Sequence, residues 1–264
     1  MCLAVLAYET HPQYRLILAS NRDEFYQRPS LPAHFWPDSP HILAGRDLQN
    51  KGTWLGITKQ GKLALLTNVR DPANSRTDRP SRGEIVTRFL RDLISPEDYL
   101  EELLSTGEKY NGFNLLFGSI TKLFYYCNHP QKWDILLPGI HALSNANLNT
   151  PWPKVASAQD SLQDLIRNKE NIDKQDLFEI LFRDKTYPLE TLPQTGVGAE
   201  LEKMLSPVFI YSPNYGTRSS TLLFVDYQNQ VTFIEKTFDK QEHADTYSKR
   251  LQAKENRHFF QIKA

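Results

Sequence analysis

Short runs of aliphatic, β-branched and aromatic residues recur along the chain, and each has the length and composition of a β-strand. In the N-terminal half these runs are CLAVLAY (2–8), YRLILAS (14–20), WLGIT (54–58), KLALLTN (62–68), FNLLFGS (113–119) and KLFYYCN (122–128). The C-terminal half adds VFIYS (208–212), STLLFVD (220–226) and VTFIEKT (231–237). Several intervals between neighbouring runs are short and carry turn residues, which predicts antiparallel hairpins.

Helical spacing of apolar residues appears in four other segments, which occur as two pairs. They cover residues 82–93, 96–104, 160–166 and 173–182. Hairpin strands interrupted by paired helices favour an α+β fold in which helices lie outside packed antiparallel sheets. We assign residues 1–264 to a single domain, because layered folds often reach this size as one unit.

Charge and cysteine content argue against several classes of protein. Lys plus Arg and Asp plus Glu number 31 each, and no long run of one sign indicates nucleic-acid binding. The first apolar run is far shorter than the roughly 20 residues that span a bilayer, and it lacks signal-peptide features. We therefore expect a cytoplasmic protein without stable membrane insertion. The only cysteines, Cys2 and Cys127, imply neither a disulfide framework nor a zinc site, so no metal is expected.

Cys2 is the most informative single position. Removal of Met1 would place a thiol and a free α-amino group on one residue, which combines a nucleophile with its own base. The amine titrates near pH ~8 and the thiol near ~8.5, so a neighbouring cation would make the pair competent around neutrality. The alternative is that this cysteine simply begins an apolar strand.

The polar segment Asn21-Arg22-Asp23-Glu24-Phe25 follows the second predicted strand directly. A hairpin would return this segment to the neighbourhood of Cys2. Arg22 could then lower the pKa of the thiol, and Asp23 could hold the α-amine by a charge-assisted hydrogen bond. The alternative is a solvated loop whose charges cap a turn.

Three further polar residues lie beside predicted strands. Asn68 and Asn145 each end an apolar run and could donate an amide N–H to a developing oxyanion. Asparagine is also a routine turn residue, so neither decides the matter alone. Arg218 precedes an apolar strand, where an arginine is most often a surface charge.

Five sequence blocks give these residues more weight. They are NRDEF (21–25), AGRD with GTWLGIT (44–47 and 52–58), TNVRDP (67–72), LSNA with PWPK (143–146 and 151–154) and YGTRSST (215–221). In this order and spacing the chain resembles the NRDE family, also called the transport and Golgi organisation protein 2 family. The blocks span most of the chain.

The resemblance implies an N-terminal-nucleophile (Ntn) hydrolase-like fold, a four-layer αββα sandwich of antiparallel sheets similar to that of penicillin V acylases and bile salt hydrolases. In those enzymes an N-terminal cysteine works with an arginine and an aspartate after the second strand, two asparagines and a later arginine. The matching candidate catalytic positions here are Cys2, Arg22, Asp23, Asn68, Asn145 and Arg218. Arg and Asp are adjacent here, whereas the acylase pattern separates them by two residues, so both cannot keep the acylase geometry without a local adjustment.

Two functions of different class follow from the resemblance. The first is hydrolysis of a carbon–nitrogen amide by the Cys2 thiolate, for which no cofactor is required. The second is haem trafficking or the handling of acyl-CoA or lipid without hydrolysis. A separate, third possibility is an adaptor that acts through protein contacts. Haem would be a non-covalent ligand, because the chain has no CxxCH string.

Ligand contacts are expected from His141 as a candidate axial ligand and from Phe35, Trp36 and Trp54 as a pocket wall. Glycines in the GTWLGIT block would permit close backbone approach there. The alternative for all four residues is ordinary core packing. Cys127 lies in an aromatic strand, where we expect a buried, inert thiol.

Overall fold

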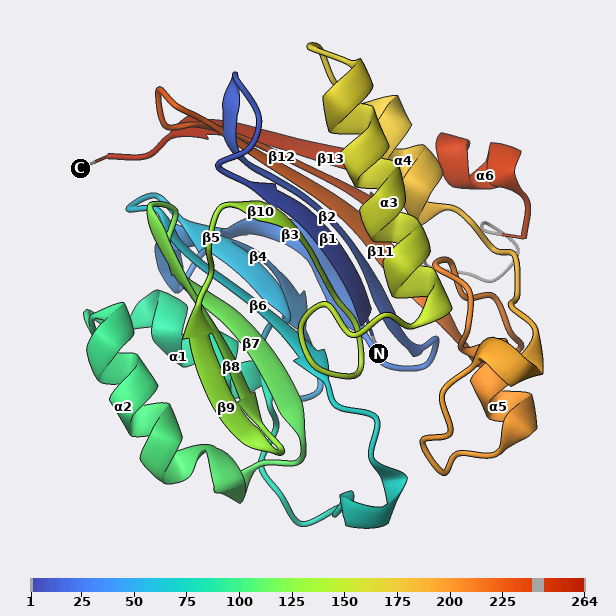
Figure 1. Ribbon diagram of the computed structural model, residues 1–264. Coiled ribbons are helices and arrows are strands. Elements are labelled where there is room, and N and C mark those ends of the chain that lie inside the picture. The colour runs from blue at the N-terminus through green and yellow to red at the C-terminus, as the bar shows by residue number, and fades with distance from the viewer. Residues whose placement is uncertain (1, 239–244, 264) are drawn as a thin grey trace. The chain divides into compact units, whose positions relative to one another are not determined.

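The computed structural model describes residues 2–238 and 245–263, and for Cys2 only the backbone (Figure 1). The chain divides into two compact units, each built from several segments. One comprises the chain up to residue 27, residues 138–144 and residues 148–259. The other comprises residues 28–137, residues 145–147 and the chain from residue 260 onward. We call them the six-strand unit and the seven-strand unit after the sheets that they contain.

The sheet of the six-strand unit has the strand order β10-β1-β2-β11-β12-β13. Its strands are β1 (Cys2–Tyr8), β2 (Tyr14–Phe25), β10 (Gly139–Leu143), β11 (Tyr215–Asp226), β12 (Gln230–Thr237) and β13 (Lys254–Gln261). The described pairings among β10, β1, β2, β11 and β12 are all antiparallel. Its helices are α3 (Pro153–Asn168), α4 (Lys174–Leu181), α5 (Ala199–Met204) and α6 (Tyr247–Gln252), with the short turn η3 (Leu189–Thr191).

Strand alternation builds the core of the six-strand unit. Alternate residues of β1 and β2, among them Val5 and Ile17, join one apolar cluster with Leu162 of α3 and Phe178 of α4. Figure 1 shows α3 and α4 lying along the sheet, with α3 over β1 and β10 and α4 over β2 and β11. Each fully buried aliphatic or aromatic side chain of this kind stabilises the fold by about 1.5–3 kcal/mol relative to exposure.

The seven-strand unit contains an antiparallel meander in which β3 to β9 follow one another in sequence order. The strands are β3 (Ser30–Trp36), β4 (Ser39–Asp47), β5 (Leu55–Thr58), β6 (Lys62–Asn68), β7 (Phe113–Ser119), β8 (Lys122–Asn128) and β9 (Gln131–Ile135). The helices α1 (Gly83–Arg91) and α2 (Pro96–Thr106) cover one face of this sheet, and η1 (Pro72–Asn74) and η2 (Gly107–Lys109) lie in its loops. A second apolar cluster, including Phe89, Tyr99 and Phe117, joins the helices to the sheet.

Most of the predicted elements are confirmed. All six N-terminal strands form, and so do the hairpins β1–β2, β5–β6 and β7–β8. The four predicted helices correspond to α1, α2, α3 and α4, one pair in each unit. The α+β class with antiparallel sheets flanked by helices is therefore correct.

Three expectations were wrong or incomplete. VFIYS (208–212) is not a strand, because within it only Tyr211 forms an isolated bridge, with Gly216. β2 extends to Phe25, so NRDEF (21–25) is strand and not a loop beyond the strand. The sequence patterns also missed β3, β4, β9 and β13. Prolines and charges interrupt the apolar alternation of β3 and β4.

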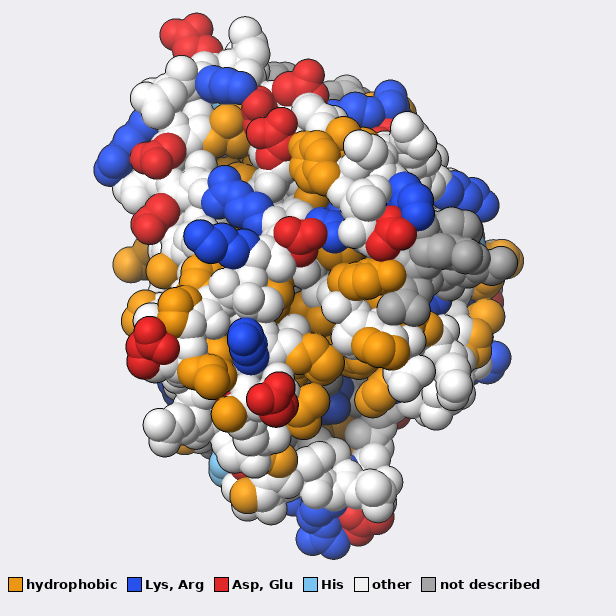
Figure 2. All heavy atoms as spheres, turned by 90° about the vertical axis from the view of Figure 1, so that its right-hand side faces the viewer, with side chains coloured by type: hydrophobic (Ala, Val, Ile, Leu, Met, Phe, Trp, Pro, Cys, Tyr) orange, Lys and Arg blue, Asp and Glu red, His pale blue; other side chains and the backbone are white. Residues whose placement is uncertain are grey.

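The surface reflects the equal numbers of acidic and basic residues in the sequence. On the face shown in Figure 2, acidic and basic side chains are interspersed and neither sign forms a continuous tract. Across residues 2–238 and 245–263, no helix combines the length and apolar character needed to cross a bilayer.

Candidate active site

The backbone register places the start of the chain opposite Arg22. Cys2 is the first residue of β1, and its Cα partner on β2 is Arg22. Arg22 is in turn the partner of Ser219 on β11. The three positions therefore form one row across three adjacent strands, and the predicted hairpin accounts for the first two of them. The side chain of Cys2 lies outside the described part of the structure.

Arg22 and Asp23 are consecutive residues of an extended strand, so their side chains point to opposite faces of the sheet. Asn21 identifies the face that it shares with Asp23, because its side-chain amide donates to the carbonyl oxygens of Leu181 at 2.7 Å and Val208 at 2.9 Å. That face carries helix α4. Because Arg22 and Asp23 are neighbours on an extended strand, the guanidinium and the carboxylate lie on opposite faces of the sheet and not side by side.

Asp23 is buried and held by a hydrogen bond from the hydroxyl of Thr217 to its Oδ1 at 2.7 Å. Burial raises the pKa of Asp23, and the opposing effects of Lys154, the Thr217 hydrogen bond and Arg22 do not cancel it. The carboxyl group therefore holds its proton to a higher pH than an exposed aspartate does.

Lys154 is another buried polar residue near Asp23, and it was not among the site residues predicted from the sequence. It lies in the first turn of α3, is almost fully buried, and donates from Nζ to the carbonyl oxygen of Leu205 at 3.0 Å. Its charge lowers the pKa of Asp23. The signal that could have identified it is its place in the PWPK block (151–154), where a lysine follows two prolines at a helix start.

Arg218 lies where the pairing of β11 with β2 shifts register, between Thr217 and Ser219. Its Nη1 donates to the carbonyl oxygens of Phe25 and Tyr26, each at 3.0 Å. Both carbonyls belong to the end of β2 and the residue after it. The side chain is buried and holds this strand end, and a direct part in catalysis stays a prediction.

Asn68 and Asn145 meet in the seven-strand unit. The side-chain amide of Asn145 donates to the backbone oxygen of Asn68 at 2.8 Å, and the backbone N–H of Arg70 donates to the oxygen of Asn145 at 2.8 Å. Asn145 is buried and Asn68, at the end of β6, is half-buried. The structure therefore brings these two predicted residues together, and their part in chemistry at Cys2 stays a prediction.

A polar network beside this pair was missed by the sequence analysis. Asn114 donates from its amide to the backbone oxygen of Ala146 at 2.8 Å and to the hydroxyl of Thr67 at 3.2 Å. Its Oδ1 accepts from the hydroxyl of Tyr125 at 2.8 Å. The network fixes residues 145–147 against β6 and β7. The one available signal was a lone asparagine inside the apolar run FNLLFGS (113–119).

The predicted aromatic wall divides between two environments. Trp36 is fully buried in the apolar cluster of the seven-strand unit, and its indole N–H donates to the oxygen of Ala44 at 3.1 Å. This packing makes Trp36 a core residue, which corrects its assignment to a pocket wall. Phe35 and Trp54 are half-buried, and the Trp54 ring fills the space where a side chain at Gly45 would lie.

Close backbone approach does occur in the GTWLGIT block (52–58), but it serves helix packing. A Cβ atom on Gly52 would lie 2.6 Å from the carbonyl carbon of Gly83, at the start of α1. Only glycine tolerates that distance. The observed approach is therefore between this backbone and the start of helix α1, and a ligand contact at the block stays a prediction.

The remaining candidates are His141 and Cys127. His141 lies on β10 as the Cα partner of Leu6, and its Nδ1 is 3.1 Å from the side-chain nitrogen of Asn149. Its role as a haem ligand stays a prediction. Cys127 is fully buried, as expected, and burial raises the pKa of its thiol. No cluster of three or more His, Cys, Asp or Glu side chains suited to a metal occurs in the described part of the chain.

Comparison with known proteins identifies the family. Residues 1–240 match the sequence model of the family described as Transport and Golgi organisation 2. The Transport and Golgi organization protein 2 homolog of Homo sapiens is 37% identical over 257 residues, covering 90% of this chain and 93% of the relative. The homolog of Bos taurus is 34% identical over the same length, with the same coverage.

Solved structures with low sequence identity share the fold. The Caenorhabditis elegans ortholog of N-acylethanolamine-hydrolyzing acid amidase has a TM-score of 0.51 and 12% identity over 84% of this chain and 92% of its own. The C2A mutant of conjugated bile acid hydrolase from Clostridium perfringens has a TM-score of 0.54 and 10% identity over 99% of this chain and 92% of its own. These similarities show an Ntn-hydrolase-like fold.

The chain therefore belongs to the Transport and Golgi organisation 2 family, and its fold is that of Ntn-type amidases.

Proposed function

We propose that this member of the Transport and Golgi organisation 2 family is a cysteine-nucleophile amidohydrolase that cleaves a carbon–nitrogen amide of a small molecule. The observation that carries the proposal is the register of the sheet, in which Cys2 at the start of β1 is the Cα partner of Arg22 on β2. A cation beside a thiol favours the thiolate, which is the reactive form. The fold shared with an acid amidase and a bile acid hydrolase supports the same reaction class.

The reaction begins after removal of Met1, which leaves Cys2 with a free α-amino group. The Cys2 thiolate attacks the amide carbonyl carbon, and the carbon–nitrogen bond breaks as the α-ammonium group gives its proton to the departing amine. The thioester that forms is hydrolysed by water, with the α-amine taking the proton of that water. The products are a carboxylic acid and an amine, and the cysteine is restored.

The buried polar residues Asp23, Thr217 and Arg218 of the six-strand unit hold the end of β2, where Arg22 is the Cα partner of Cys2. Arg218 holds the carbonyl oxygens at the end of β2, and Thr217 holds Asp23. Both interactions fix the conformation of the strand that carries Arg22. Asn68 and Asn145 belong to the seven-strand unit, and their service as oxyanion donors is part of the proposal.

Mass spectrometry of the folded protein tests the proposal directly. The protein is incubated with an N-acylethanolamine and with a glycine-conjugated bile acid, which represent a long-chain amide and a bulky amide. We expect loss of Met1, an acyl adduct that maps to Cys2, and release of free amine. Cys2→Ala should abolish the adduct and the release, and Cys127→Ala should leave both unchanged.

Two outcomes would contradict hydrolysis. The first is retention of Met1 on the folded protein, because an acylated amine cannot act as the base. The second is that amine release persists in Cys2→Ala. Stoichiometric capture of either amide without release of amine would favour a carrier that uses the same residues only for binding.

A further inference from the structure

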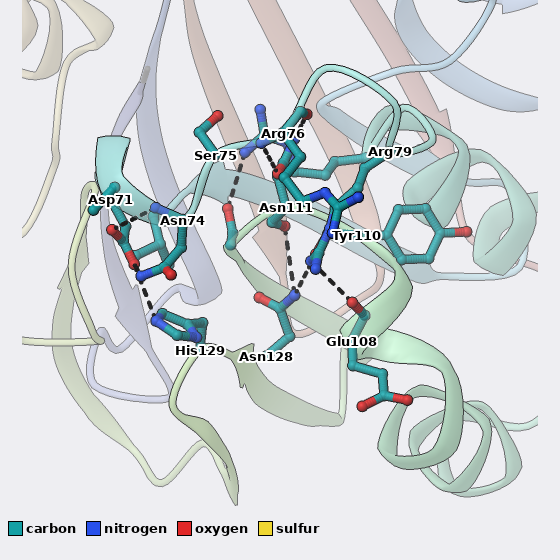
Figure 3. Close-up of a pocket in the computed structure, with 14 residues that line it drawn as sticks. Asp71, Asn74, Ser75, Arg76, Arg79, Glu108, Tyr110, Asn111, Asn128 and His129 are labelled. Carbon is teal, nitrogen blue, oxygen red and sulfur yellow. Dashed lines mark hydrogen bonds and ion pairs between the residues drawn. The ribbon is translucent and has the colours of Figure 1, made fainter.

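A cavity of about 390 Å³ opens in the seven-strand unit beyond the end of β6. Three segments line it: loop 69–82 with η1, residues 108–112 at the approach to β7, and Asn128 at the end of β8 with the following His129. We call this cavity the loop pocket (Figure 3). Its volume lies in the range of roughly 300–1,000 Å³ that is typical of small-molecule sites.

Side-chain amides fix the walls of the loop pocket to each other. Asn111 accepts from the backbone N–H of Arg76 at 2.8 Å and donates to the Arg76 oxygen at 2.7 Å. Asn128 donates to the oxygen of Gly107 at 2.9 Å and accepts from the N–H of Phe113 at 2.7 Å. Asn111 therefore ties the middle of the loop to the approach to β7, Asn128 ties the end of β8 to the same segment, and the pocket is preformed.

Arg79 supplies a positive charge that is held in place by neutral partners. Its Nη1 donates to the carbonyl oxygens of Glu108 at 2.9 Å and Tyr110 at 2.5 Å. Among the residues that the structure describes, no carboxylate forms an ion pair with Arg79, and its Nε and Nη2 make no hydrogen bond. Because carbonyl contacts orient a guanidinium without neutralising it, the remaining N–H groups can serve an anion.

The lining carries three arginines, Arg76, Arg79 and Arg82, and two carboxylates, Asp71 and Glu108, and the charge of nearby Asp78 acts on both Arg76 and Arg79. Arg76 adds a second guanidinium, which forms an exposed ion pair with Asp78 at 2.9 Å. On the opposite side, the Asp71 carboxylate accepts from the amide of Asn74 at 2.7 Å and lies 3.0 Å from His129 Nε2. Figure 3 shows the side chain of Glu108 directed away from Arg79.

We propose that the loop pocket binds a small organic phosphate, with Arg79 and Arg76 on the phosphate group. A planar guanidinium fork matches the oxygen atoms of a phosphate, and the amide-rich lining suits a polar body for the rest of the ligand. The volume exceeds that of a phosphate group alone, which leaves room for that body. This site is separate from the amide hydrolysis proposed at Cys2 and does not depend on it.

Calorimetric titration with inorganic phosphate at constant ionic strength tests the site. The wild-type protein should show saturable binding of one phosphate per chain. Arg79→Gln should weaken that binding by about tenfold or more, since it removes charge-assisted hydrogen bonds. The matched control is Arg88→Gln on α1, because Arg88 pairs with Glu102 and Asp92 and does not line the pocket. Arg88→Gln should bind phosphate like the wild type.

A second variant protects the test against a folding defect. Within residues 2–238 and 245–263, the one partner of the Arg76 guanidinium is the exposed carboxylate of Asp78. Arg76→Gln should therefore keep the fold, as checked by thermal melting, and weaken phosphate binding severalfold. Wild-type protein that does not bind phosphate saturably would overturn the proposal, and so would an equal loss in Arg88→Gln or unchanged affinity in both pocket variants. Cys2→Ala should bind phosphate normally, which separates this site from the hydrolase proposal.

Discussion

At the scale of single residues, the two cysteines of the chain are predicted to differ in reactivity. Cys127 is fully buried on β8, and burial raises the pKa of its thiol. Cys2 is the register partner of Arg22. Because the thiolate is the reactive form and burial disfavours it at Cys127, iodoacetamide at neutral pH should label Cys2 at least about tenfold faster than Cys127. Brief alkylation of the folded protein followed by peptide mapping measures both rates.

Arg22→Gln is the matched variant for this comparison. It should slow the labelling of Cys2 and leave Cys127 unaffected, because Cys127 belongs to the other sheet. Preferential labelling of Cys127, or equal slow labelling of both residues, would refute an activated Cys2.

A second prediction separates the two tryptophans that the sequence grouped together. Trp36→Ala should lower the free energy of unfolding by about 3–5 kcal/mol, because it empties a fully buried site. Trp54 is half-buried, so Trp54→Ala should cost about 1–2 kcal/mol. Urea unfolding at constant pH gives both values. Equal losses would place Trp54 in the core as well.

The sequence could predict those site residues that lie on neighbouring strands of one hairpin. Cys2 and Arg22 fall in this class, since a short turn between two apolar runs sets their register. Lys154 and Asn114 could not be found in this way. Asn114 is a single polar residue in an apolar run and gives no periodic signal, and Lys154 is marked only by its place in the PWPK block (151–154). Their partners Ala146 and Leu205 lie 32 and 51 residues away along the chain.

At the scale of elements, the sequence pattern predicts strands well where apolar residues are continuous. It predicts them poorly where polar or ion-paired residues interrupt the run. β2 continues through NRDEF because Asn21, Arg22 and Asp23 are buried and paired across the sheet. β4 continues through Arg46 and Asp47, whose charges are met by Asp38 and Arg28. Long-range partners of this kind cannot be seen in a local window, so the sequence left a loop open as the alternative for NRDEF and gave no prediction for β4.

Strand β13 offers an element-scale prediction. Burial alone would raise the pKa of Glu255, but hydrogen bonds and charges from Lys174, Arg257 and Lys236 lower it to about 2. Because this pKa is lower than in the unfolded chain, the stabilisation is present above pH ~4.5 and is lost as the pH falls toward 2. Glu255→Gln should therefore lower the free energy of unfolding at pH 7 by on the order of 1–3 kcal/mol, and the difference from wild type should vanish near pH 2.

The matched control is Glu97→Gln, which removes an exposed ion pair with Lys122 and should change stability by less than about 0.5 kcal/mol at any pH. Thermal or urea unfolding of the three proteins across this pH range provides the measurement. A constant difference between wild type and Glu255→Gln from pH 7 to pH 2 would show that the ion pairs do not link α4 and β12 to β13 as described.

At the scale of the whole molecule, the path of the chain bears on the prediction of a single domain. The chain passes from one unit to the other at residues 27–28, 137–138, 144–145, 147–148 and 259–260. Neither unit is a continuous segment, so unfolding of one releases the ends of segments that the other needs. We therefore expect one cooperative unfolding transition for the chain.

Two matched core substitutions test this cooperativity. Phe182 is almost fully buried among Phe178, Phe209 and Phe238 in the six-strand unit. Phe117 is buried against Phe89 and Phe124 in the seven-strand unit. Phe182→Leu and Phe117→Leu should each shift the same urea transition by about 1–2 kcal/mol, with circular dichroism and tryptophan fluorescence giving coincident curves. Two separable transitions, each shifted by only one of the substitutions, would instead divide the chain into two independently folding domains, because each core would then be stabilising only its own unit.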